Sequence, residues 1–352
     1  MRVAPPSRGL PDPMEDAMSA PTTAVPAVLS RAGALELVRL ATLAPSGHNT
    51  QPWLFEVRED AVVVRPDLSR RLPAVDPDDH ALFISLGAAL ENLLIAAGEQ
   101  GLASEVEAFG AGEPEGILVR LRPARPAEAV AEPALAAAIL ERQSTRRTYD
   151  RRPIPSADLR RLEQAAARDG VVLRLITSRA DVEALVPFVE DGNRAQFGDP
   201  AFVDELVSWV RFGKAEAAAR RDGLAGAALG MPSVPRWVGT FVMKRLLSGE
   251  GEARRTAEAV RSSSALALFA TERNDRKGFV DLGRSFERLA LAATALGLKH
   301  AHVNMPCEVL PVRERLRAHL GLGHAQPLLL VRLGYAPARP RSLRRPVEDV
   351  LA

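Results

Sequence analysis

The segment at 44–53, APSGHNTQPW, concentrates residues that direct the backbone and residues that form hydrogen bonds. Its first proline fixes φ, its serine can cap a turn, and its glycine permits a positive φ. The amides that follow add side-chain donors and acceptors. A loop of this kind is suited to hold a planar, polar small molecule. The candidate binding residues in it are Pro45, Ser46, Gly47, Asn49 and Gln51.

A second concentration of polar residues is RQSTRR at 142–147. Arg142 and Arg146 are four residues apart and would share a helix face if the preceding helix continued through them. With the hydroxyls of Ser144 and Thr145 between them, they can form charge-assisted hydrogen bonds to one phosphate. The competing interpretation is a solvated basic helix end, which the helix dipole favours. The same two interpretations apply to the C-terminal RPRSLRRP at 339–346.

Other chemistry has less support. His300 and His302 would face one side of a strand, but the sequence offers no nearby third ligand, so no metal site is expected. Cys307 lies between prolines and is either a reactive thiol or, more commonly, a small packed residue. The sequence has no G-x-x-x-x-G-K-[ST], no G-x-G-x-x-G after a strand and no G-x-S-x-G.

Composition narrows the class of protein. The 352 residues, 47% hydrophobic and 26% charged, have the balance of a soluble globular protein of one large or two ordinary domains. All but four of the 46 basic residues are arginine, but acidic residues leave a net charge of only +2, a weak case for nucleic acid. A single cysteine fits a reducing compartment. With no secretory signal and no run of 18 apolar residues, we expect a cytoplasmic protein without a membrane or nucleic-acid partner.

The apolar pattern indicates the elements that must position these residues. A helix over 29–43 leads into the first loop, and a hairpin over 54–66 follows it. The remaining expected elements are a helix at 82–100, a strand from Ile117, a helix ending near 141, a helix at 156–168, a strand at 171–177, a helical region at 181–256, a strand at 265–271, a helix at 281–296 and a strand at 327–335.

An internal repeat relates the two long helices. Eight residues recur 196 positions later, and each helix is followed by the strand LVRL, at 118–121 and 330–333. The repeated residues of the first helix are Leu86, Gly87, Glu91, Leu93, Ala96, Ala97, Gly101 and Leu102. We therefore predict a disordered tail at 1–27, a first half at 28–134, and a second half at 135–352 with a helical insertion at about 181–256.

Taken together, these segments resemble the FMN-dependent nitroreductase family. Its motifs R-x-S-x-[RK], A-P-S-x-x-N-x-Q-P-W, P-x-E-G and a basic segment before proline look like RQSTR at 142–146, APSGHNTQPW at 44–53, MPCEV at 305–309 and SLRRP at 342–346. The resemblance covers most of the chain except the tail and the insertion. It implies an α+β, nitroreductase-like fold, duplicated in one chain, with mixed β-sheets flanked by helices.

The departures from the family pattern are informative. The first half has SRAGALELV, with Arg31 as its only basic residue, where the arginine motif should be. The second half has ARDGVVLRL where the proline-serine loop should be, and Val309 replaces the usual glycine. Family members are homodimers whose FMN sites combine the arginine motif of one subunit with the loop of the other. The complementary losses therefore imply one surviving site, as in the Acg-like branch of single-chain pseudo-dimers, for which a monomer is plausible.

The resemblance also implies roles for individual residues. FMN is the implied cofactor, and its phosphate and ribityl chain would be held by Arg142, Gln143, Ser144, Arg146, Arg341 and Arg344. The flavin ring edge would lie on Pro45, Ser46 and Gly47, while Asn49 and Gln51 would shape the loop. Pro306, Cys307 and Glu308 would approach the flavin near its reactive nitrogen, and no side-chain acid or base is required.

Two functions follow from the resemblance. The first is NAD(P)H-dependent reduction of a nitroaromatic or quinone-like acceptor by the bound FMN. The alternative is a protein that sequesters FMN without turnover, which a bulky insertion and Val309 would favour. An arginine-driven nucleic-acid binder is a third hypothesis, and the near-balanced charge argues against it.

Overall fold

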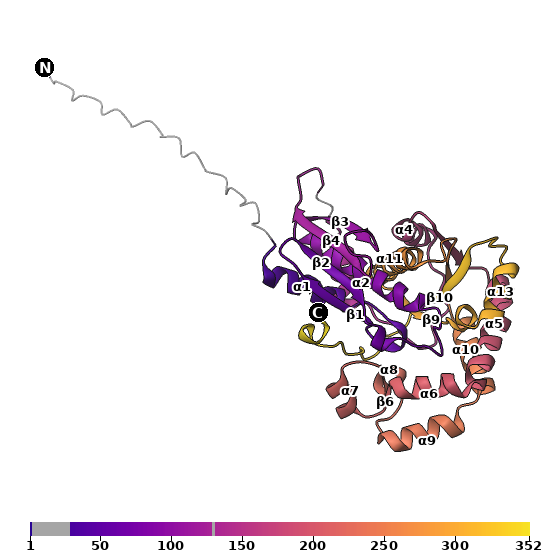
Figure 1. Ribbon diagram of the computed structural model, residues 1–352. Helices are drawn as coiled ribbons and strands as arrows, with labels where there is room; N and C mark the ends of the chain where they lie inside the picture. The colour runs from indigo at the N-terminus through magenta and orange to yellow at the C-terminus, as the bar shows by residue number, and fades with distance from the viewer. Residues whose placement is uncertain (2–28, 129–130) are drawn as a thin grey trace.

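The computed structural model describes residue 1 and residues 29–128 and 131–352. The predicted disorder of the tail at 1–27 lies outside the described residues, apart from residue 1. Two four-stranded antiparallel sheets lie on either side of two long helices that pack against each other (Figure 1). Buried side chains of both sheets and both helices form one continuous hydrophobic core. This architecture confirms the predicted α+β class.

The first sheet has the order β1-β2-β4-β3. Its strands are β1 (Trp53–Val57), β2 (Ala61–Pro66), β3 (Leu102–Ala108) and β4 (Ile117–Pro123), with helices α1 (Arg31–Ala41) and α2 (His80–Glu99). The predicted hairpin is confirmed, because Trp53 pairs with Pro66 and Val57 with Val62. The pattern did not predict β3, an edge strand that carries charged side chains such as Glu105 and so lacks an apolar run.

The second sheet has the order β5-β8-β10-β9. Its strands are β5 (Val171–Ile176), β8 (Ala265–Thr271), β9 (Lys299–His302) and β10 (Gln326–Gly334). The helices around it include α3 (Pro133–Glu141), α4 (Ser156–Ala166), α11 (Arg276–Ala295), α12 (Met305–Glu308) and α13 (Leu310–His319). Because α3 ends at Glu141, and Arg142 adopts φ −57° and ψ 132°, the conditional expectation that Arg142 and Arg146 share a helix face is wrong.

The two long helices contact each other through a reciprocal pair of glycines. A Cβ atom on Gly87 of α2 would collide with the carbonyl oxygen of Val280, and one on Gly283 of α11 would collide with that of Ile84. Both partners are offset by the same 196 residues, so each helix presents the same site to the other, as at a two-fold interface. The two sheets also have the same order of strands. In that order, β1, β2, β4 and β3 match β5, β8, β10 and β9.

The predicted helical region at 181–256 is confirmed as mainly helical, and its two ends belong to the second half. Helices α5 (Arg179–Gly198) and α10 (Gly249–Arg261) share a core with β8 and β10, which includes Val186, Val260 and Leu330. Between them lies the segment 199–248, which projects from the sheets in Figure 1. It contains α6 (Pro200–Trp209), β6 (Val210–Arg211), α7 (Lys214–Arg220), β7 (Leu224–Ala225), α8 (Gly226–Leu229) and α9 (Arg236–Leu246).

One helix in the described part of the chain, α2, is long and apolar enough to cross a membrane by composition alone. Because 83% of that stretch is buried inside the fold, it has the surroundings of a core helix. Its partner in that core is α11, which contributes Leu282 and Leu289.

Candidate functional site

The loop at 44–53 has an unusual backbone. His48, Asn49 and Gln51 all adopt positive φ, at 47°, 56° and 55°. Non-glycine residues tolerate this region only where surrounding contacts hold them in it. One such contact is internal, since Ser46 Oγ accepts the Gln51 N–H at 2.9 Å. The loop is therefore held in one specific shape.

Asn49 and Gln51 join this loop to two distant segments. Asn49 Nδ2 donates to the carbonyl oxygens of Gly223 at 3.0 Å and Leu343 at 3.2 Å. Gln51 Nε2 donates to the carbonyl of Arg221 at 3.0 Å, and Gln51 Oε1 accepts the N–H of Arg345 at 2.8 Å. Both amides are thus occupied by the projecting segment and the C-terminal segment, which places them as anchors of the loop.

Arg142 lies buried where the first half meets the second. Its Nη2 donates to the carbonyl oxygen of Leu43 at 2.8 Å, directly before the loop. Its Nε lies 3.2 Å from Glu287 Oε1, and both side chains are almost fully buried. Among the described residues, Nε and Nη1 have no hydrogen-bond partner of acceptable geometry. The guanidinium therefore retains donors for a further acceptor.

Arg344 reaches the same place from the C-terminal segment. It donates to the carbonyl oxygens of Thr42, Leu43 and Ala44 at 2.9, 3.1 and 3.0 Å. Burial, and next the nearby charge of Arg142, lower the pKa of Arg344 to about 9. The exposed Arg341 also lowers the pKa of Arg142, after the larger effect of burial. The structure thus brings Arg142, Arg341 and Arg344 together at the start of the loop.

Arg146 lies near this group, because its charge and that of Arg142 both act on His302. Its side chain is accessible to solvent, yet burial by the surrounding protein lowers its pKa. Burial, followed by the charge of Arg146, lowers the pKa of His48 to about 4 and that of His302 to about 3. Both imidazoles are therefore neutral near pH 7 and lie close to the positive charge of Arg146.

The remaining residues of RQSTRR fix the path of that segment. Ser144 forms a parallel bridge with His300, and the Thr145 N–H donates to the His300 carbonyl at 2.8 Å. Gln143 Oε1 accepts the N–H of Arg339 at 2.9 Å. The segment therefore lies between β9 and the C-terminal segment, which supplies Arg341 and Arg344. The solvated helix end considered from the sequence does not describe Arg142.

The segment MPCEV forms the short helix α12 and the turn after it. Burial raises the pKa of Cys307, which makes its thiol unreactive and supports the packed-residue interpretation. Glu308 accepts hydrogen bonds from Gln196 at 2.6 Å and Asn304 at 3.2 Å, so its carboxylate contacts α5 and not the arginines. Pro306 is also buried in this helix. Val309 has φ −86°, a conformation that needs no glycine.

Two members of this site were not singled out from the sequence. The sequence contained a signal for Glu287, namely a glutamate repeated at positions 91 and 287 of two apolar helices. Both carboxylates are buried, and a buried carboxylate requires a cation beside it. The only sequence signal for His48 was its position within the loop at 44–53. Its Nε2 is buried without a hydrogen-bond partner in the described part of the chain.

The donor set fits an anion. Arg142 and Arg344 act on the buried carboxyl of Glu287, whose pKa is raised to about 7 mainly by burial, and Arg341 lies near both arginines. Buried nitrogens of Arg142 and His48 still lack acceptors within the described ranges. Guanidinium groups bind phosphate through charge-assisted and often bidentate hydrogen bonds. A phosphate group has the charge and the acceptors that these donors require.

A second polar cluster, formed by Asp76, Asp78 and His80, could hold a metal by spacing alone. However, Asp76 accepts the N–H groups of Ala81 and Leu82 at 3.0 and 2.9 Å and so caps α2. Burial opposes a charge on His80, but hydrogen bonds with Asp76 and Asp78 outweigh it and raise its pKa to about 9. The hydrogen bonds of Asp76 and the ion pairs of His80 therefore stabilise the start of α2.

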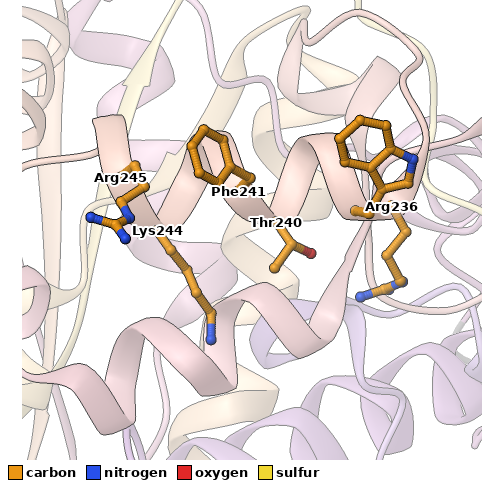
Figure 2. Close-up of a pocket in the computed structure, with 6 residues that line it drawn as sticks. Arg236, Thr240, Phe241, Lys244 and Arg245 are labelled. Carbon is orange, nitrogen blue, oxygen red and sulfur yellow. The ribbon is translucent and has the colours of Figure 1, made fainter.

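A shallow hollow of about 670 Å³ lies on α9 (Figure 2). It is lined by Arg236, Trp237, Thr240, Phe241, Lys244 and Arg245. Trp237 and Phe241 are exposed there, and none of the predicted cofactor residues lines it. The hollow is therefore separate from the group formed by Arg142, Arg341 and Arg344.

The sequence of the chain is similar to those of known proteins. No family model matches it. A Mycobacterium tuberculosis protein provisionally named NAD(P)H nitroreductase Rv3131 is 29% identical over 328 residues, which are 90% of each chain. A second protein of that organism, provisionally named NAD(P)H nitroreductase Acg, is 25% identical over 321 residues, 89% of this chain and 93% of its own.

Solved structures of similar proteins include the FMN-dependent nitroreductase NfnB of Mycobacterium smegmatis in complex with NADPH. It is 15% identical, with 61% of this chain and 96% of that chain covered and a TM-score of 0.42. Over about nine-tenths of its length, the chain is similar in sequence to the two Mycobacterium tuberculosis proteins named as nitroreductases, one of which is Acg.

Proposed function

We propose that this protein binds one FMN per chain, in a recess built from both of its halves. The carrying observation is that Arg142 and Arg344, from the second half, both donate to the carbonyl oxygen of Leu43 in the first half. That contact brings the arginine group to the loop at 44–53. A phosphate there would meet several guanidinium groups while the loop lies beside the rest of the cofactor.

We further propose that the chain is a pseudo-dimer that arose by internal duplication. Support comes from the matching strand orders of the two sheets and from the reciprocal contacts of Gly87 and Gly283. A single chain that supplies both halves of its own interface can stand as a monomer, and we expect that state. A cytoplasmic location, expected from the sequence, is also part of the proposal.

The proposal of a single site rests on the residues at the equivalent second position. There Glu91 accepts hydrogen bonds from Arg284 at 2.7 Å, Arg288 at 2.9 Å and Arg168 at 3.4 Å. Arg288 also pairs with Glu132 and donates to the carbonyl oxygen of Ala165 at 2.9 Å. Within the described part of the chain, each of these arginines is thus paired with a carboxylate of the protein, although Arg168 Nε keeps no hydrogen-bond partner. The second position therefore offers a phosphate fewer unpaired cations.

Specific roles follow for the residues of the recess. Arg142, Arg146, Arg341 and Arg344 would hold the phosphate, with Gln143 and Ser144 beside the ribityl chain. The backbone at Pro45, Ser46 and Gly47 would contact the edge of the flavin ring. Pro306, Cys307 and Glu308 would lie near its reactive nitrogen. In this arrangement the side chains bind and orient the cofactor, and none acts as a general acid or base.

The proposed activity is reduction of a nitroaromatic or quinone-like acceptor. FMN would accept a hydride from NAD(P)H and pass electrons to the acceptor. The support is that two full-length relatives are provisionally named NAD(P)H nitroreductases.

A second candidate, sequestration of FMN without turnover, is favoured by one observation. The projecting segment is fastened to the loop by Asn49 and Gln51, and Arg70 of the first half pairs with Asp222. A fastened cover would slow the access of NAD(P)H and acceptors. Flavin reduction decides between the two functions: bleaching of bound FMN within seconds of adding NADPH supports the enzyme, and a flavin that stays oxidised supports sequestration.

The visible spectrum of the purified protein tests the binding itself. We expect a flavin spectrum, release of FMN on denaturation, and one FMN per chain by absorbance. Two FMN per chain would contradict the single site. A protein that neither carries FMN nor takes it up would contradict the proposal as a whole.

A further inference from the structure

The buried carboxyl of Glu287 has an incomplete set of partners. Its Oε1 lies 3.2 Å from Arg142 Nε, and its Oε2 has no hydrogen-bond partner among the described residues. In the amide orientation that satisfies both of its groups, Asn92 donates to Glu287 Oε1 at 3.1 Å and accepts the Ala44 N–H at 3.2 Å. Glu287 therefore joins α11 to the arginine motif and, through Asn92, to the loop at 44–53.

The equivalent carboxyl 196 residues earlier has a different environment. Glu91 is also buried, but it receives three arginines, namely Arg168, Arg284 and Arg288. Burial opposes its charge, yet these arginines lower the pKa of Glu91 below its ordinary value. Burial instead raises the pKa of Glu287 to about 7, because Arg142 and the more distant Arg344 compensate it incompletely. The three arginines thus favour the ionised form of Glu91, whereas the carboxyl of Glu287 can gain or lose a proton near neutral pH.

We propose that Glu287 is a positioning residue that controls, through its own protonation, how much positive charge the recess offers to a phosphate. This inference rests on the proposed FMN site. When Glu287 is ionised, it neutralises Arg142, which also donates to Leu43 and so stays in place. When Glu287 is neutral, the full charge of Arg142 is available to the phosphate. Binding of the phosphate dianion then favours the protonated carboxyl.

The charged and titratable groups around Glu287 set the direction of this effect. Arg142 faces it from the end of α3, Arg344 from the C-terminal segment, and Glu91 from α2. Arg341 and His300 face Arg142 in turn, and burial keeps His300 neutral. A phosphate beside Arg142 adds negative charge, so it raises the pKa of Glu287 further above 7. FMN binding should therefore take up protons, and affinity should fall as the pH rises through about 7.

The test is FMN titration of the apo-protein, followed by quenching of flavin fluorescence, for wild type and Glu287→Gln. The range of about pH 7 to 8.5 keeps the phosphate a dianion, since its second pKa is near 6. Wild-type affinity should weaken by roughly tenfold across this range, whereas the Glu287→Gln variant should change by less than about twofold. The matched control is Glu99→Gln, which removes an exposed carboxyl from the end of α2 and should keep the wild-type pH dependence.

A second measurement covers the case in which the variant does not fold. Calorimetric titration of wild type with FMN in two buffers of different ionisation enthalpy should show uptake of up to about one proton near pH 7.5. Absence of proton uptake, or equal pH dependence in wild type and Glu287→Gln, would overturn the role of Glu287 while leaving the FMN site intact. Absence of FMN binding by wild type at every pH would overturn the site and the inference together.

Discussion

Asn49 and Gly223 bind each other twice, although 174 residues separate them. The Asn49 side chain donates to the Gly223 carbonyl at 3.0 Å, and the Gly223 N–H donates to the Asn49 carbonyl at 3.0 Å. Asn49 is buried, so water cannot replace these bonds freely. The proposed cofactor loop and the projecting segment are therefore one structural unit, and the stability of the loop depends on both.

Replacing Asn49 with alanine should loosen this unit. The loss of a buried amide with two acceptors costs about 1–3 kcal/mol, and the strained backbone at residue 49 favours asparagine over alanine. We expect faster release of FMN, by about tenfold, and easier proteolysis of the segment 199–248. Stopped-flow release and limited proteolysis measure the two effects. Asn274→Ala, at an exposed asparagine, is the matched control; equal rates for both variants would contradict the role of Asn49.

Replacing Arg142 and Arg146 with alanine together should give colourless protein. The double variant removes two of the cations proposed to bind the phosphate, each charge-assisted hydrogen bond being worth about 1.5–3 kcal/mol. Absorbance after purification and the FMN dissociation constant give the result. The control removes the exposed arginines Arg160 and Arg220 instead, which matches the change of charge. A normal flavin spectrum in the double variant would disprove the assignment.

The raised pKa of His80 predicts that the free energy of unfolding of the protein depends on pH. The pKa of His80 is raised from 6.5 to about 9 in the folded protein, so its contribution is complete below about pH 6.5 and disappears as the pH rises through about 9. The shift corresponds to at most about 3 kcal/mol. The variant His80→Gln should therefore lose most stability relative to wild type near pH 6 and much less near pH 10. Urea unfolding at several pH values measures the difference.

The exposed His324 provides the control for that experiment. His324→Gln should change the free energy of unfolding by no more than about 0.5 kcal/mol at any pH. A loss of stability in His80→Gln that stays constant from acidic to alkaline pH would show that the ion pairs with Asp76 and Asp78 do not stabilise the start of α2.

The contact between the long helices predicts a strong effect of Gly283→Ala. A Cβ at this position collides with the carbonyl oxygen of Ile84, and a backbone atom cannot move aside as a side chain can. The overpacking should cost about 1–3 kcal/mol despite the better helix propensity of alanine. Thermal unfolding measures it. Gly198→Ala, where no atom lies within 4 Å of the added Cβ, should be close to neutral. Similar melting temperatures for both variants would contradict the close approach.

The sequence by itself indicated most of the elements and the resemblance to the nitroreductase family. The periodicity of residues 29–43, the hairpin over 54–66 and the long apolar helices depend on local pattern, and all are present as α1, β1–β2, α2 and α11. The repeat at 196 residues was visible because both helices must bury the same face. The motif residues Arg142 and Arg344 were recognisable because their types and order match phosphate-binding segments.

Only the tertiary structure decided which partners these residues have. Positions 91 and 287 both hold a glutamate. Glu91 pairs with three arginines, whereas Glu287 pairs with Arg142. Asn49 and Gln51 carry side chains suited to a ligand, but they bind backbone of residues 221–223 and 343–345. Such differences depend on contacts between residues far apart in the chain. Local pattern holds no information about them, because burial and charge pairing are set by packing.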